Sequence, residues 1–160
     1  MILVLTGTHQ QQFNRLLEAV DALALPDVIA QTGHSTFQPR GTCHQSLPFE
    51  DVQRLLREAD IVICHAGTGT VMSALAAGKC PVVAPRFVQF GEHVDNHQIE
   101  LVAALAENDL IIPWLPGNDL AAALEQARGK NTLRQAGPAP ALVEHLHQAV
   151  LRSASRRART

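Results

Sequence analysis

Five short runs of apolar residues recur along the chain without any alternation between apolar and polar positions. A strand that is buried on one face alternates in this way, whereas a strand that is covered on both faces does not. The runs span residues 2–5, 28–30, 61–64, 82–84 and 110–112. We therefore expect strands of a parallel sheet with helices packed on both of its faces.

Apolar residues with helical spacing fill the intervals between these runs. The clearest period covers residues 13–23, and Thr8 with Gln11 has the spacing of a capping box just before it. The other periods cover residues 52–56, 70–77, 99–105, 120–124 and 142–150. Residues 32–47 predict turns and one more short strand near Thr42 and Cys43. This order of strands and helices predicts an α/β fold, a single Rossmann-like doubly wound parallel sheet.

The composition is that of one ordinary globular domain. The 160 residues are 46% hydrophobic and 18% charged, and the net charge of -2 gives no reason to expect a nucleic acid partner. We expect one domain over residues 1–151. Residues 152–160 carry four arginines and almost no apolar residue, which predicts a basic, disordered tail. A weak contact of this tail with anionic lipid or an acidic partner is the alternative.

Cysteine use and the short apolar runs favour a cytoplasmic protein. Cys43, Cys64 and Cys80 are odd in number and lack CxxC spacing, so we expect reduced and buried thiols. The first run, MILVL, is too short for the core of a signal peptide, and no run reaches the roughly 18 residues of a membrane-spanning helix. Nucleophilic catalysis has little support, because no GxSxG elbow occurs and the thiols are expected to be inert.

Three strand-to-helix loops carry unusual chemistry, and a doubly wound sheet places such loops at the carboxyl ends of its strands. The first is TGTH at residues 6–9. Gly7 would let a ligand approach the backbone closely, and Thr8 offers a hydroxyl group next to a helix N-terminus that favours an anion. A plain tight turn with Thr8 as the helix cap is the alternative.

The second loop, HAGTGT at residues 65–70, runs directly into a predicted helix. Gly67 and Gly69 leave the main chain bare, and Thr68 and Thr70 add hydroxyl groups. Free N–H groups and the positive end of the helix dipole therefore converge on one point, which suits a diphosphate. His65 could donate a hydrogen bond to a phosphate oxygen, or it could serve as a structural partner.

The third loop, RFVQFGEHVDNHQIE at residues 86–100, leads into the helical period at residues 99–105. Its residues 92–98 are almost all hydrogen-bonding side chains, which suit the hydroxyl groups of a sugar. His93 and His97 also have the spacing of two zinc ligands on one helix face. No glutamate follows His93, and no third ligand is evident, so we predict no metal site.

Taken in order, these loops resemble the donor-binding half of GT-B glycosyltransferases of the family 28 type, in which two Rossmann-like domains clamp a nucleotide sugar. The likeness is greatest to the eukaryotic dolichol-linked N-acetylglucosaminyltransferase donor subunit and to subunits of bacterial exopolysaccharide glycosyltransferases. The matching segments are VLTGTH, QTGHS, ADIVICHAGTGT, ALAAGKCPVVAPR and FGEHVDNHQIELVAAL, within residues 1–108. The resemblance implies one half of a GT-B fold.

The resemblance also implies roles for individual residues toward a UDP-sugar. Those implied for the diphosphate are Gly7, Thr8, His65, Gly67, Thr68, Gly69 and Thr70. Those implied for the sugar are Asp95, Asn96 and Gln98, and the backbone near Phe49 would read the base. The family commonly has an acidic residue for the ribose where this chain has Ser73, which leaves the identity and the affinity of the donor open.

Length and resemblance together predict a half-enzyme. We expect a membrane-associated partner subunit to supply the acceptor domain and the catalytic base. The chain would lie at the cytoplasmic face of the membrane and transfer sugar to a lipid-linked or exopolysaccharide acceptor. No metal would be required, since His65 and main-chain N–H groups would stabilise the leaving diphosphate. The alternatives are a catalytically silent nucleotide-sugar-binding regulatory module, and an unrelated Rossmann-like epimerase or hydrolase that acts alone.

Overall fold

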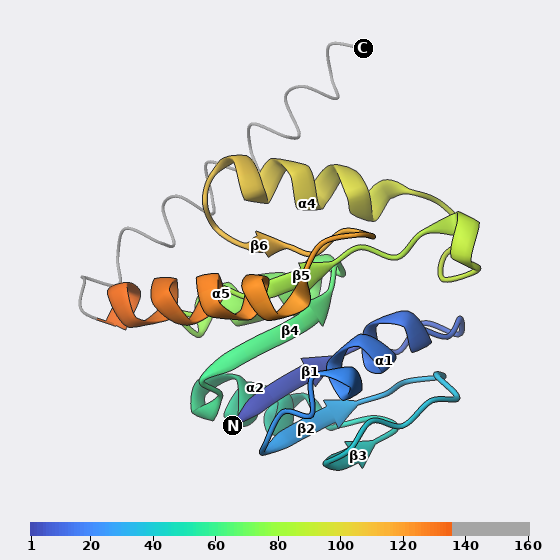
Figure 1. Cartoon of the computed structure of the whole chain (residues 1–160), viewed down its shortest axis with the longest axis horizontal. Helices are drawn as coiled ribbons and strands as arrows, with labels where there is room; N and C mark the ends of the chain where they lie inside the picture. The colour runs from blue at the N-terminus through green and yellow to red at the C-terminus, as the bar shows by residue number, and fades with distance from the viewer. Residues whose placement is uncertain (136–160) are drawn as a thin grey trace.

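Six strands form one sheet in the computed structural model, which describes residues 1–135 (Figure 1). Their order across the sheet is β3-β2-β1-β4-β5-β6, and each neighbouring pair is parallel. The strands are β1 (Ile2–Leu5), β2 (Val28–Gln31), β3 (Thr42–His44), β4 (Ile61–His65), β5 (Val82–Ala84) and β6 (Ile112–Pro113). The predicted doubly wound parallel sheet is confirmed, including the short strand near Thr42.

Helices cover both faces of this sheet. The helices are α1 (Asn14–Ala22), α2 (Phe49–Glu58), α3 (Thr68–Ala76), α4 (His97–Glu107) and α5 (Leu120–Gln135), with a short 3-10 helix η1 (Val88–Phe90) before α4. One core joins the sheet to α1 and α5, and the other joins it to α2, α3 and α4. Alternate residues of β1 enter opposite cores, Ile2 and Val4 one of them and Leu3 and Leu5 the other. The strand is therefore apolar at every position.

The start of the first helix differs from the prediction. α1 begins at Asn14, and its N-cap residue makes no side-chain hydrogen bond, so the capping box of Thr8 with Gln11 is wrong. Backbone N–H groups at this end are instead bound by the side-chain oxygens of Ser35 and Gln12. Thr8 consequently lies in a loop ahead of the helix and not at its N-terminus.

Two other elements begin about two residues away from their predicted first residues. α3 begins at Thr68 and not at Thr70, because Gly67 already has the extended backbone of an N-cap residue. The last strand is shifted toward the C-terminus, because the N–H of Leu110 still bonds to the Leu105 carbonyl at the end of α4. The N–H of Ile112 is the first to join the sheet, through the Pro81 carbonyl.

The three cysteines are free, and two of them are buried as predicted. Burial raises the pKa of the Cys64 thiol to about 12, which makes it inert. Cys43 is only half-buried, so the prediction is wrong for this residue, which lies on the edge strand β3.

Some predictions fall beyond the part of the chain that is described. These are the helix at residues 142–150, the domain end at residue 151 and the basic tail at residues 152–160. Between residues 1 and 135, no helix combines the length and the apolar character needed to cross a bilayer.

Candidate functional site

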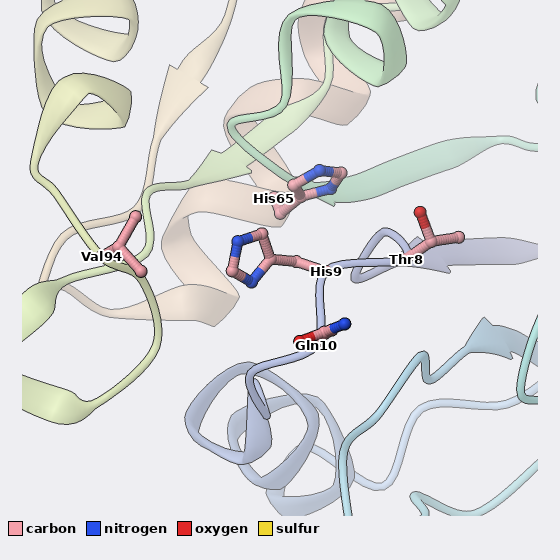
Figure 2. A pocket seen from close by; sticks show the side chains of 5 residues that line it. All are labelled: Thr8, His9, Gln10, His65 and Val94. Carbon is pink, nitrogen blue, oxygen red and sulfur yellow. The ribbon is translucent and has the colours of Figure 1, made fainter.

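The three loops meet at the carboxyl edge of the sheet, because β1, β4 and β5 are neighbours there. They enclose an open cleft of about 600 Å³ (Figure 2). The first loop, which in the structure extends over residues 6–13 between β1 and α1, contributes Thr8, His9 and Gln10. The second loop contributes His65, and the third contributes Val94. The structure thus brings two of the predicted residues, Thr8 and His65, to one cleft.

His65 occupies a slot between two glycines, which we call the His65 slot. A Cβ atom at Gly7 would lie 2.6 Å from two atoms of the imidazole ring, and one at Gly67 would overlap Nε2. Gly7 also has a φ of +79°, which favours glycine on its own account. These two glycines are therefore needed to house the ring of His65.

The hydrogen bonding of His65 defines its tautomer. Nδ1 lies 3.3 Å from the Leu5 carbonyl oxygen, which can only accept, so Nδ1 carries the hydrogen and Nε2 carries a lone pair. Burial, reinforced by the positive charge of Arg86, lowers the pKa of His65 to about 4. In the free protein near neutral pH, His65 is therefore uncharged, and its Nε2 is an acceptor.

The N-terminus of α3 is open beside this ring. Gly67 is the N-cap residue and makes no side-chain cap, and both Thr68 and Gly69 are exposed. A Cβ atom at Gly69 would meet nothing within 4 Å. The N–H groups of the first helical turn, with the positive end of the dipole, are thus available to an anion.

The polar residues of the third loop bind the loop itself. Gln98 Oε1 accepts the Arg86 backbone N–H at 3.0 Å, and Asn96 Oδ1 accepts that of Val88 at 3.3 Å. Asp95 Oδ1 accepts the His97 N–H at 3.0 Å, and this bond lowers the pKa of the Asp95 carboxyl group. All three order the loop next to Val94 in the cleft. Their role toward a sugar stays a prediction.

The remaining predicted residues lie apart from the lining of the cleft. Phe49 is the first residue of α2 and is 72% exposed, and Ser73 is half-buried within α3. Within residues 1–135, no three His, Cys, Asp or Glu side chains are grouped so that they could hold a metal ion. The pair of His93 with His97 therefore gains no third ligand among the described residues.

Arg86 is a functional candidate that the sequence reasoning missed. Its guanidinium is 1% exposed and donates from Nη1 to the carbonyl oxygens of Gln11, Gln12 and Glu92, and from Nη2 to that of Thr6. Burial lowers its pKa to about 10, so it stays charged at neutral pH. Arg86 thereby ties the first loop to the third. The signal that was available in the sequence is a charged residue two positions after the buried strand at residues 82–84.

Arg15 and Glu92 complete this connection. The buried carboxylate of Glu92 accepts hydrogen bonds from Arg15 Nε at 2.9 Å and Nη2 at 3.0 Å. It also accepts the N–H of Phe87. The Arg15 guanidinium lies 5.0–5.5 Å from the centres of four aromatic rings, which belong to Phe13, Phe87, Phe90 and Trp114. Helix α1 is thus held against the third loop.

Comparison with known families gives a match over most of the chain. The model of the glycosyltransferase family 28 C-terminal domain matches residues 1–151. One similar protein is the UDP-N-acetylglucosamine--N-acetylmuramyl-(pentapeptide) pyrophosphoryl-undecaprenol N-acetylglucosamine transferase of Acinetobacter baylyi. It is 34% identical over 119 residues, which are 66% of this chain and 32% of that protein. Another is the UDP-N-acetylglucosamine transferase subunit ALG13 of Yarrowia lipolytica, 45% identical over 56 residues, which are 35% of this chain and 26% of that one.

Solved structures share the fold at low sequence identity. The glycotransferase of kitacinnamycin aligns with a TM-score of 0.66 at 20% identity, covering 94% of this chain and 42% of that one. The calicheamicin glycosyltransferase CalG4 aligns with a TM-score of 0.62 at 18% identity, covering 98% and 42%. The fold is therefore one half of a GT-B fold. The chain spans about a third or less of the length of the curated relatives named above.

Proposed function

The chain belongs to the glycosyltransferase family 28 C-terminal domain family, and from this we propose that it is the donor-binding half of a glycosyltransferase that uses a UDP-sugar. The observation that carries the proposal is the open N-terminus of α3 beside His65, a residue that lines the cleft shared by the three strand-to-helix loops. Main-chain N–H groups at a helix N-terminus bind phosphate without any cationic side chain. The diphosphate would lie there, on Thr68, Gly69 and Thr70.

The reaction would need stabilisation of charge on the leaving group. Transfer breaks the bond between the sugar C1 and a phosphate oxygen, and the electron pair stays on the diphosphate, which gains one negative charge. Preorganised N–H donors and a helix dipole stabilise that charge without a metal. His65 would have to take up a proton at Nε2 before it could donate to the phosphate, and a bound diphosphate favours such uptake.

An acceptor-binding half would complete the enzyme. The relative from Yarrowia lipolytica is named as a subunit of a transferase, and the relative from Acinetobacter baylyi is named for a pyrophosphoryl-undecaprenol acceptor. These names support a membrane-associated partner subunit that supplies the base and holds a lipid-linked or exopolysaccharide acceptor at the cytoplasmic face. The chain would then be bound to the membrane through that partner.

Calorimetric titration of the protein with UDP, UDP-N-acetylglucosamine, ADP and GDP tests the donor role. We expect uridine nucleotides to bind and the purine nucleotides to bind more weakly. If no nucleoside diphosphate binds, even with an acceptor-binding partner present, the donor role is refuted.

A second candidate function is a catalytically silent nucleotide-sugar-binding module that regulates a partner. Ser73 favours it, because a half-buried serine hydroxyl in α3 cannot replace a carboxylate that binds the ribose diol. An assay with the partner and a lipid acceptor separates the two functions. The module predicts nucleotide binding without sugar transfer.

Gln98→Glu is expected to weaken UDP-N-acetylglucosamine by about 2- to 12-fold more than UDP, the loss of one hydrogen bond of about 0.5–1.5 kcal/mol. The substitution keeps the Oε1 acceptor for the Arg86 N–H and removes the amide N–H group that would meet a sugar hydroxyl. The added charge acts on both ligands, so the ratio of their dissociation constants isolates the sugar. Gln53→Glu on α2 is the matched control, and an unchanged ratio for Gln98→Glu would contradict the sugar role.

A further inference from the structure

Two histidines without an assigned role in the proposed function, His9 and His93, stack on each other beside the cleft. The rings of His9 and His93 have centroids 4.7 Å apart and planes inclined by 30°. His9 comes from the loop between β1 and α1, and His93 from the loop between η1 and α4. The ring of His9 projects into the space between His65 and Val94 (Figure 2). We call these two residues the His9–His93 pair.

Backbone hydrogen bonds define the tautomers of the pair. His9 Nδ1 accepts the N–H of Gln11 at 3.3 Å, and His93 Nδ1 accepts that of Asp95 at 3.2 Å. With Nδ1 as the acceptor of these bonds, each ring carries its hydrogen on Nε2 and can donate from it. Oδ1 of Asp95 also lies 3.2 Å from Nδ1 of His93.

The surroundings of His9 favour its neutral form while the cleft is free of ligand. Burial lowers the pKa of His9, and the neighbouring His93, Arg86 and His34 lower it further, while Asp95 alone opposes them. His65 is uncharged as well, and none of the five side chains that line the cleft has a fixed charge. The guanidinium of Arg86 is engaged by four carbonyl oxygens. A diphosphate that enters the cleft would therefore add negative charge next to imidazoles with room for a proton.

We propose that the His9–His93 pair is a further diphosphate-binding element, in which His9 takes up a proton when the diphosphate enters the cleft. The pair would contribute one Nε2–H donor from each ring, and the proton added to His9 would place a positive charge beside the diphosphate. This inference rests on the proposed function, since it assumes that the cleft receives a nucleoside diphosphate group. It adds two imidazole side chains to the main-chain N–H groups already proposed for the diphosphate.

Linkage gives the direction of the pH dependence. Binding takes up a proton wherever the pKa of His9 is higher in the complex than in the free protein. Affinity then rises as the pH falls between the two values, by up to about tenfold per pH unit for one proton, and levels off below the value of the free protein. UDP-N-acetylglucosamine is the better probe, because UDP has a terminal phosphate that itself titrates with a pKa of about 6.

Calorimetry in buffers of different ionisation enthalpy counts the protons directly. The full chain is titrated with UDP-N-acetylglucosamine at about pH 7 in PIPES, HEPES and Tris, and the slope of the observed enthalpy against the buffer enthalpy is the number of protons taken up. We expect a slope well above zero for the wild type and a clearly smaller slope for His9→Asn, in which only a proton taken up by His65 would remain. His93→Asn should bind more weakly, because it lacks one Nε2–H donor. His44→Asn on the exposed edge strand β3 should keep the wild-type slope.

The inference is overturned by a zero slope in the wild type, even if a variant fails to fold, and by a slope that His9→Asn leaves unchanged. A slope that disappears in His65→Asn but persists in His9→Asn would assign the proton to His65 instead. Binding without proton uptake leaves the proposed function intact, whereas absence of binding by any uridine nucleotide removes both.

Discussion

Arg86→Met is expected to lower the free energy of unfolding by about 3–5 kcal/mol, the usual cost of removing one partner from a buried charged network. The substitution leaves four carbonyl oxygens without their donor, those of Thr6, Gln11, Gln12 and Glu92. It also removes a guanidinium that lies 4.6 Å from the Phe13 ring. Because these contacts hold the first loop to the third, ligand affinity should fall together with stability.

Urea unfolding followed by circular dichroism measures the change. Arg54→Met is the matched control, because Arg54 is exposed and pairs with Asp51 and Glu58 on the surface of α2. We expect the control to unfold at the same urea concentration as the wild type. Arg86→Lys should also be destabilised, because an ammonium group cannot reproduce a fork that reaches carbonyls on both loops. Equal stability of Arg86→Met and Arg54→Met would show that the two loops are held by other contacts.

Gly67→Ala is expected to destabilise the protein by about 1–3 kcal/mol and to abolish nucleotide binding, since the added methyl group overlaps the ring of His65. The backbone of Gly67 (φ -77°, ψ 127°) is open to any residue, so strain in the main chain makes no contribution. The ring cannot move away on the opposite side, where Gly7 closes the His65 slot.

A double-mutant cycle identifies the cause. Combining Gly67→Ala with His65→Ala should restore much of the lost stability, because the two changes act on one contact. Gly69→Ala is the matched control in the same loop. Its Cβ atom would lie in open space, so stability should be unchanged or higher by up to about 1 kcal/mol. A Gly67→Ala protein as stable as the wild type would mean that the ring of His65 is not confined there.

Much of the architecture was predictable from local pattern. The unalternating apolar runs identified β1, β2, β4 and β5, because every side chain of a strand covered on both faces meets a core. The density of glycine and threonine after β4 identified the loop that leads into α3. The predicted capping box is wrong, because the side-chain oxygens of Ser35 and Gln12 accept the backbone N–H groups at the start of α1.

Contacts between distant loops were beyond such reasoning. Nothing in a local pattern pairs Arg86 with the carbonyl of Thr6, or stacks His9 on His93. The role of Gly67 also changes once the structure is known, because the space left by its missing side chain is filled by an imidazole ring.

By itself, the order of residues determined which segments are strands, that the strands are parallel, and which loops gather at their carboxyl ends. Those properties follow from periodicity and chain connectivity, which are local. The tertiary structure alone decided which side chains meet across the loops, the tautomer of His65 and the charge state that burial imposes on it. Such properties depend on distances between groups far apart in the chain, and only the packing of the folded domain defines these distances.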